Sequence, residues 1–99
     1  MNKNYRKGYR IERKAIEELK KAHGCFLVIR SAGSKGVFDL VGFSGICFLV
    51  QVKARKNTKP TKREIEHIKS SMPLKPHYIW CGLWIWDYED KEFKKYWWI

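Results

Sequence analysis

Hydrophobic residues near the start of the chain recur at intervals of three and four, and charged residues fill the positions between them. Gly24 follows this stretch and is a typical helix stop signal. The pattern predicts an amphipathic helix over residues 6–23. The apolar side of that helix consists of Ile11, Ala15, Ile16, Leu19 and Ala22.

Short apolar runs after this helix are typical of strands. Residues 26–29 form one such run, which ends in the turn-forming segment 31–36. Residues 37–43 and 46–54 are rich in β-branched and aromatic side chains, and Ser44-Gly45 between them is a hairpin signal. We expect these two segments to be the central strands of a sheet.

A second helix is indicated by a capping box, in which Thr61 is followed three residues later by Glu64. Apolar residues then recur at helical spacing until Pro73 and Pro76, which end the helix. The sequence therefore predicts a helix over about 61–71.

Aromatic residues dominate the rest of the chain. Residues 77–88 predict a strand region interrupted at Gly82, and residues 93–98 predict a last strand. The resulting order, α-β-β-β-α-β-β, favours an α/β fold in which a mixed sheet is flanked by helices. The length of 99 residues leaves room for one domain, residues 1–99.

The charge adds a functional clue, because 21 Lys and Arg residues face only 10 Asp and Glu residues. The excess is uneven: residues 1–63 carry 16 basic and 4 acidic side chains, whereas residues 64–99 carry 5 and 6. A polyanion such as DNA is the expected partner, although charge alone does not separate a nuclease from a passive binding protein.

Cysteine and histidine usage argues against disulfides and zinc. Cys25, Cys47 and Cys81 are odd in number and lie in apolar runs, as free thiols in a reducing compartment do. The histidines have no ligand spacing, and His23 is expected to complement a helix C-terminus. No apolar stretch approaches the ~18 residues of a membrane span. We expect a cytoplasmic protein without membrane contact.

Two acidic residues, Glu12 and Asp39, lie in regular elements among apolar neighbours. A strand carboxylate must be paired or bind a metal, because burying it alone costs several kcal/mol. The pattern suits metal-assisted phosphodiester cleavage, because Asp39 on one strand is followed on the next strand by Gln51 and, two residues later, Lys53. The alternatives are a structural Asp39–Lys53 ion pair and a helix salt bridge of Glu12, for instance with Arg13.

Strand alternation makes this hypothesis testable. A two-residue turn at Ser44-Gly45 would place Asp39 on the opposite face from Gln51 and Lys53. A three-residue loop, residues 43–45, or a bulge would bring all three side chains to one face. We predict one of these irregularities.

A set of short motifs in residues 5–56 resembles the archaeal-type Holliday junction resolvases, members of the PD-(D/E)xK superfamily of restriction-endonuclease-like nucleases. The second helix and the next strand match this family more loosely, and the tail beyond Trp86 is shorter. The matching motifs are Tyr5-Arg6-Lys7-Gly8, Glu12-Arg13, His23-Gly24, Arg30-Ser31-Ala32-Gly33-Ser34-Lys35, Asp39-Leu40-Val41 and Val52-Lys53.

The resemblance implies a restriction-endonuclease-like sheet and Mg²⁺-dependent cleavage, with Mn²⁺ able to substitute and no small-molecule cofactor. Lys53 would be the catalytic lysine, and Ser34 would lie beside the scissile phosphate. Gln51 departs from the family, which usually has Glu there; Gln occurs at this place in the Mrr-like branch of the superfamily. The implied metal-site residues are Glu12, Asp39, Gln51 and the carbonyl of Val52.

The implied substrate is branched DNA, above all the four-way junction. Arg13 and Arg30 match family positions that engage the junction, and Arg6 and Lys7 match its basic N-terminal arm, for which a frayed cationic terminus is the alternative. Flaps or duplex DNA, cut by a virus-encoded or repair enzyme, and a non-catalytic DNA-binding protein are the other possibilities. The full set of expected DNA contacts is Arg6, Lys7, Arg10, Arg13, Arg30, Lys35, Arg55 and Lys56.

The tryptophans predict a second surface. Trp80, Trp84 and Trp86 alternate along one sheet face, and the chain ends in Trp97-Trp98-Ile99. A twofold dimer would present two active sites to the two symmetric strands of a junction. We expect a homodimer with contacts through Trp84, Trp86, Trp97 and Trp98; the alternative is stacking of these rings on bases.

Overall fold

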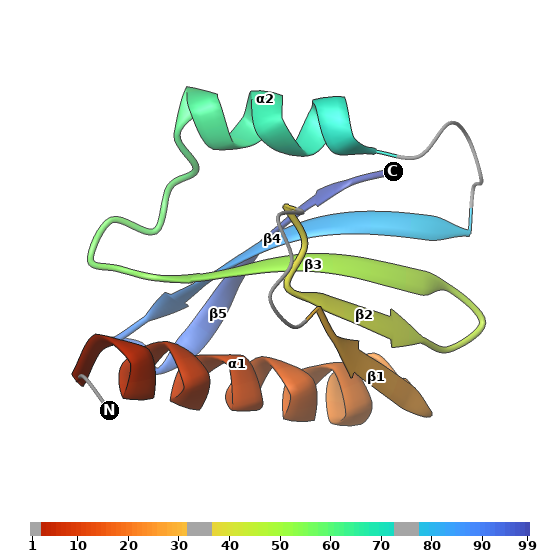
Figure 1. The fold of residues 1–99 in the computed structure, drawn as a ribbon, viewed down its shortest axis with the longest axis horizontal. Helices are drawn as coiled ribbons and strands as arrows, with labels where there is room; N and C mark the ends of the chain where they lie inside the picture. The colour runs from red at the N-terminus through yellow and green to blue at the C-terminus, as the bar shows by residue number, and fades with distance from the viewer. Residues whose placement is uncertain (1–2, 32–36, 73–77) are drawn as a thin grey trace.

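A computed structural model describes residues 3–31, 37–72 and 78–99, without the side chains of residues 3–7. Two helices and five strands follow one another in the predicted order α-β-β-β-α-β-β (Figure 1). The elements are α1 (Lys3–Ala22), β1 (Leu27–Arg30), β2 (Leu40–Phe43), β3 (Cys47–Ala54), α2 (Lys62–Ser71), β4 (Ile79–Asp87) and β5 (Glu92–Trp98).

The five strands form one mixed sheet in the order β1-β2-β3-β4-β5. Neighbouring strands are antiparallel except β3 and β4, which run parallel and are joined through α2. Because β3 and β4 are parallel, their C-terminal ends lie at the same end of the sheet, and the N-terminal end of α1 lies there as well (Figure 1). The predicted α/β class is confirmed.

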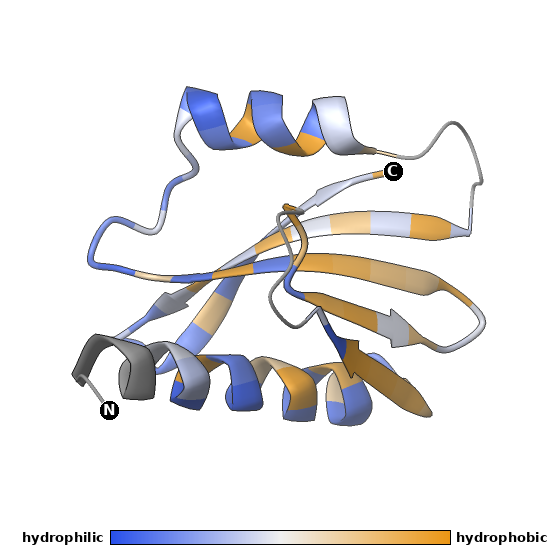
Figure 2. Cartoon of the chain, viewed as in Figure 1, coloured by the Kyte–Doolittle hydropathy of each residue, from blue (hydrophilic) through white to orange (hydrophobic). Residues whose placement is uncertain are grey.

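The helices cover opposite faces of the sheet. α1 buries Ile11, Ala15 and Leu19 against one face. The start of α2 follows the predicted capping box, since Glu64 N–H donates to Thr61 Oγ1 at 3.1 Å and Thr61 N–H donates to Glu64 Oε1 at 2.9 Å. Ile68 is the buried residue of α2 on the other face. The charged faces of both helices point outward, whereas the central strands are apolar (Figure 2).

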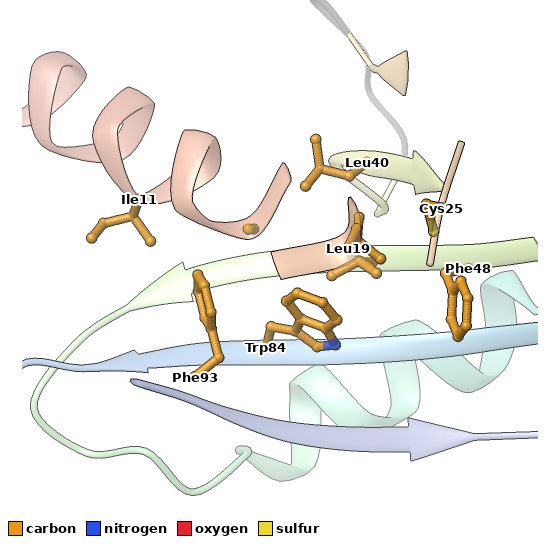
Figure 3. Close-up of a cluster of buried hydrophobic side chains, with 9 residues drawn as sticks. Ile11, Leu19, Cys25, Leu40, Phe48, Trp84 and Phe93 are labelled. Carbon is orange, nitrogen blue, oxygen red and sulfur yellow. The ribbon is translucent and has the colours of Figure 1, made fainter. Parts of the chain in front are cut away.

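The larger core lies between α1 and the sheet. Leu40 and Val50 supply its aliphatic floor, and Phe48 and Trp84 supply buried rings. Figure 3 shows Leu40, Phe48 and Trp84 in the space between α1 and the sheet. The tight contact extends to Gly42, where a Cβ atom would lie 2.9 Å from the sulfur of Cys25.

β4 is a continuous strand, so the predicted interruption at Gly82 is wrong. The β4–β5 register runs through the Gly82–Trp97 pair without a bulge. A Cβ atom on Gly82 would lie 2.8 Å from the Trp97 ring. The glycine therefore makes room for an aromatic ring on the next strand and does not break the sheet.

The three cysteines are free thiols, as the sequence predicts. Cys25, Cys47 and Cys81 are all free, and Cys25 and Cys81 are buried as small apolar groups. No helix in the described part of the chain is long and apolar enough to span a membrane.

Candidate functional site

The connection between β2 and β3 has the predicted length. Phe43 pairs with Cys47, which leaves a three-residue link, Ser44–Ile46, one residue later than expected. The adjacent pair Leu40–Val50 shares the α1 face. By alternation, Gln51 and Lys53 fall on the other side of the sheet. Asp39 lies in a bend just before β2 and not within the strand, as had been predicted, and its carboxylate reaches β3 through the backbone of Val52.

Asp39 is fixed at the point where β2 begins. Its backbone N–H donates to the carbonyl of Val50 at 2.8 Å, and its carbonyl accepts the N–H of Ser31 at 2.9 Å. The carboxylate turns toward β3, where its Oδ2 accepts the backbone N–H of Val52 at 2.8 Å. Three hydrogen bonds, two to the backbone of β3 and one to the residue that follows β1, thus set the position of one carboxyl group.

The charges around Asp39 oppose one another. Burial raises the pKa of the Asp39 carboxyl, the Val52 hydrogen bond lowers it, the Glu12 carboxylate raises it and the Lys53 ammonium lowers it. Glu12 and Lys53 therefore both lie within electrostatic reach of Asp39. Among the described residues, no ion pair joins Asp39 to Lys53. The alternative of a structural Asp39–Lys53 pair is not what the geometry shows.

Within residues 8–31, 37–72 and 78–99, the buried Oε1 atom of Gln51 has no hydrogen-bond partner. A buried acceptor without a donor costs about 1–3 kcal/mol unless an ion, water or ligand satisfies it. Two carboxylates, one of them half-buried, and an amide oxygen are donors of the hard type that Mg²⁺ and Mn²⁺ accept. The chemistry of these donors suits a divalent cation, although no three His, Cys, Asp or Glu side chains cluster within the described ranges.

Glu12 approaches from α1, on the opposite side of the sheet from Gln51. Its Oε1 accepts the Nε–H of Arg30 at 2.6 Å, and the Arg30 guanidinium lies 5.0 Å from the centre of the Tyr9 ring. Glu12 is thus in an ion pair, as the alternative to a metal role held, but its partner is Arg30 on β1 and not a residue of its own helix. Tyr9, which sequence reasoning did not single out, also lies 6.0 Å from the Arg13 guanidinium. Its spacing of four residues from Arg13 was the available signal.

Basic side chains surround this end of the sheet. Arg10 and Arg13 are exposed on α1, and Lys53 and Lys56 are exposed at the end of β3 and just beyond it. Lys53 and Lys56 line a surface groove of about 550 Å³ that also includes Gly8 and Tyr88. The structure therefore brings four of the predicted DNA-contacting or catalytic cations to the exposed surface.

Arg55 has a structural role and is removed from the predicted DNA contacts. Its guanidinium donates to both carboxylate oxygens of Glu64, at 2.6 and 2.7 Å, and to the carbonyls of Asn57 and Lys59 at 2.7 and 2.8 Å. These bonds tie the connector after β3 to the first turn of α2. The pKa of Glu64 falls to about 2, chiefly because of the hydrogen bond from Arg55.

Several predicted residues cannot be placed. Ser34 and Lys35 lie outside the described residues, and so do the side chains of Arg6 and Lys7. Their predicted roles at the scissile phosphate and on the DNA backbone stay predictions.

The aromatic predictions need two corrections. Trp84 has 0% exposure beneath α1, so it cannot be a dimer contact. Trp86, Trp97 and Trp98 are partly buried against the two cores, and their proposed dimer role stays a prediction.

The second correction concerns His23, which does not complement the end of α1. Its ring packs near Phe48, Trp84 and Trp97, and its Nε2 lies 2.9 Å from Lys95 Nζ. Burial and the Lys95 charge lower the pKa of the partly buried His23, whereas the Glu18 carboxylate raises it.

Comparisons with known proteins add no relative. No protein-family model matches the chain, and a search of curated proteins gives no match. The function must therefore be inferred from the arrangement around Asp39 and from the surrounding charge.

Proposed function

We propose that this chain is a divalent-metal-dependent endodeoxyribonuclease of the restriction-endonuclease-like fold that resolves four-way DNA junctions. The observation that carries the proposal is the position of Asp39. Its half-buried carboxylate is hydrogen-bonded to β3 at Val52 and lies within electrostatic reach of both Glu12 and Lys53. A carboxylate kept in such surroundings without an ion-pair partner among the described residues is costly, and a cation-binding role gives a reason for keeping it.

Each residue then has a distinct task. Asp39, Gln51 and the Val52 carbonyl would hold Mg²⁺, with Glu12 completing or assisting the site. When bound, the cation supplies Lewis-acid activation of the phosphate and of a water molecule.

Lys53 is exposed on the same side of the sheet as Gln51, so its ammonium can position the attacking water and offset charge that develops on the phosphate. Glu12 must exchange Arg30 for the cation, which leaves that guanidinium beside the site for a DNA phosphate.

The charge of the protein supports a DNA substrate. A net charge of +11 on 99 residues attracts a polyanion, and exposed Arg10, Arg13 and Lys56 lie near the same end of the sheet. Contacts of this kind bind phosphates and do not read the base sequence, so binding should depend on the shape of the DNA and weaken as the salt concentration rises. The preference for a junction and a 5′-phosphate product come from the resemblance described above. A twofold dimer, also implied by it, would cut the two strands symmetrically.

A non-catalytic DNA-binding protein is the second candidate. It is favoured by the Glu12–Arg30 ion pair, which occupies one carboxylate, and by the uncharged amide at Gln51. In that case the same groove and basic side chains would bind branched DNA, and Asp39 would have no catalytic or metal-binding role.

The decisive experiment is incubation of the purified protein with a four-way junction, a flap and a linear duplex in Mg²⁺. Asp39→Ala and Lys53→Ala are the test variants, and Glu66→Ala, at an exposed position on α2, is the acidic control. Symmetric junction cuts that persist in the control and vanish in both test variants are expected. Binding of the junction without cleavage in either Mg²⁺ or Mn²⁺ would establish the non-catalytic candidate instead. Cleavage only of the flap or duplex would change the substrate and keep the chemistry.

A further inference from the structure

The groove beside Lys53 has an aromatic wall. Its lining comes from three places in the chain: Gly8 on α1, Lys53 and Lys56 at the end of β3 and beyond it, and Tyr88 in the turn after β4. Tyr88 is 41% exposed, and a Cβ atom on Gly8 would meet nothing within 4 Å. A basic groove with an exposed ring is the arrangement by which proteins hold a single nucleic-acid strand.

The turn that carries Tyr88 is held by local hydrogen bonds. Asp87 Oδ1 accepts the backbone N–H groups of Glu89 at 2.9 Å and of Asp90 at 3.2 Å. Lys91 closes the turn with a positive φ of 53°. Since these contacts restrain the backbone around Tyr88, little backbone entropy is lost when its ring contacts a ligand.

Acidic residues in this turn would repel DNA unless their charge were offset. Lys94 Nζ lies 2.9 Å from Asp90, 3.0 Å from Glu92 and 3.9 Å from Asp87. Lys94 therefore offsets one of these three carboxylate charges, and the turn as a whole stays acidic. The exposed cations of the opposite wall, Lys53 and Lys56, have no ion pair among the described residues.

We propose that Tyr88 stacks on an unpaired base of a DNA strand whose phosphates lie along Lys53 and Lys56. A paired base inside a duplex has its faces covered by its neighbours, so a ring on the groove wall can reach only a base that has left the stack. The groove thereby selects DNA with unpaired nucleotides next to the backbone it holds. The stacking of Tyr88 on a base does not depend on the proposed nuclease function. Only the position of that base, beside the reacting phosphate, rests on it.

Binding without metal tests this role of Tyr88. The probe is a fluorescein-labelled oligonucleotide, single-stranded or annealed to its complement, measured by fluorescence anisotropy in EDTA. Stacking on one base contributes about 1–3 kcal/mol, and about 1.4 kcal/mol is a tenfold change in Kd. Tyr88→Ala should therefore weaken single-strand binding by about 5- to 150-fold and leave duplex binding nearly unchanged.

Three further variants separate stacking from general loss of structure. Tyr88→Phe keeps the ring and should bind as the wild type does, whereas Tyr88→Leu keeps the apolar bulk without the ring and should behave like Tyr88→Ala. Tyr78→Ala, at an exposed tyrosine before β4, is the control and should change neither Kd. Equal losses for single strand and duplex, or unchanged binding by Tyr88→Ala, would overturn the proposal.

The outcome is independent of catalysis. If the protein never cleaves DNA but shows the Tyr88 discrimination, the nuclease proposal fails and the strand-binding groove stands. If junctions are cleaved in Mg²⁺ while Tyr88→Ala binds single strands normally, the nuclease stands and the stacking role is wrong.

Discussion

The Asp39 carboxylate should reduce the stability of the metal-free protein. Burial is the largest effect on this group, and it raises the pKa of Asp39 above its usual 3.8. A raised pKa means that folding favours the protonated carboxyl, so its stabilising contribution is present below about pH 3.8 and is lost as pH rises through the folded-state pKa. At pH 7 the ionised group opposes folding.

Asp39→Asn and Asp39→Ala separate the charge from the hydrogen bond. Asparagine removes the charge but can still accept the Val52 N–H, which Asp39 Oδ2 accepts at 2.8 Å. Alanine leaves that N–H without its acceptor, at a cost of about 1–3 kcal/mol. We therefore expect Asp39→Asn to be at least as stable as wild type at pH 7 and Asp39→Ala to be less stable than Asp39→Asn by about 1–3 kcal/mol.

Urea denaturation in EDTA at pH 7 and at low pH measures these differences. For a domain of this size, 1 kcal/mol also corresponds to a Tm change of about 4–8 °C, so thermal unfolding gives a second reading. The advantage of Asp39→Asn over wild type should shrink as the pH falls. If wild type is clearly more stable than Asp39→Asn in metal-free buffer at pH 7, the carboxylate is a structural group and the reasoning is refuted.

Three other predictions follow from single contacts. Because the folded pKa of Glu64 is about 2, its ion pair should stabilise the protein above about pH 4.5, and this stabilisation should disappear as the pH falls toward 2. Allowing for solvent screening, we expect Glu64→Gln to lower the free energy of unfolding by about 1 kcal/mol at pH 7 and to match wild type near pH 2, as measured by urea titration. Gly82→Ala should cost about 1–3 kcal/mol because its Cβ meets the Trp97 ring at 2.8 Å, whereas Gly45→Ala, with open space around it, should not; equal melting curves would contradict this. Gln51→Glu should keep or strengthen Mg²⁺ binding in calorimetry, and a weaker site would exclude Gln51 as a ligand.

Local sequence signals predicted the elements well where one interaction dominates. The Thr61–Glu64 capping box fixed the start of α2 because both of its hydrogen bonds are local. The three-residue link before β3 could be inferred because a shorter one would have separated Asp39 from Gln51 and Lys53. In both cases the constraint lay within a few residues or on two adjacent strands.

Predictions failed where a partner distant in sequence decided the outcome. Gly82 suggested a break, but it accommodates Trp97 from the next strand. Arg55 suggested a DNA contact, but Glu64 and two carbonyls occupy its guanidinium. Trp84 suggested an interface, although the helix α1 covers it completely. None of these partners could be identified from periodicity or charge, because each depends on how the sheet brings separate segments together.

The central claim is that the carboxylate of Asp39 anchors one divalent cation. Electron paramagnetic resonance measures the free Mn²⁺ that remains at each step of a titration and thereby gives the number of bound ions by difference, with Glu66→Ala on α2 as the acidic control. We expect one tightly bound Mn²⁺ per chain in wild type and in the control, and loss of that site in Asp39→Ala. No bound ion in wild type, or the same stoichiometry and affinity in Asp39→Ala, would contradict the account.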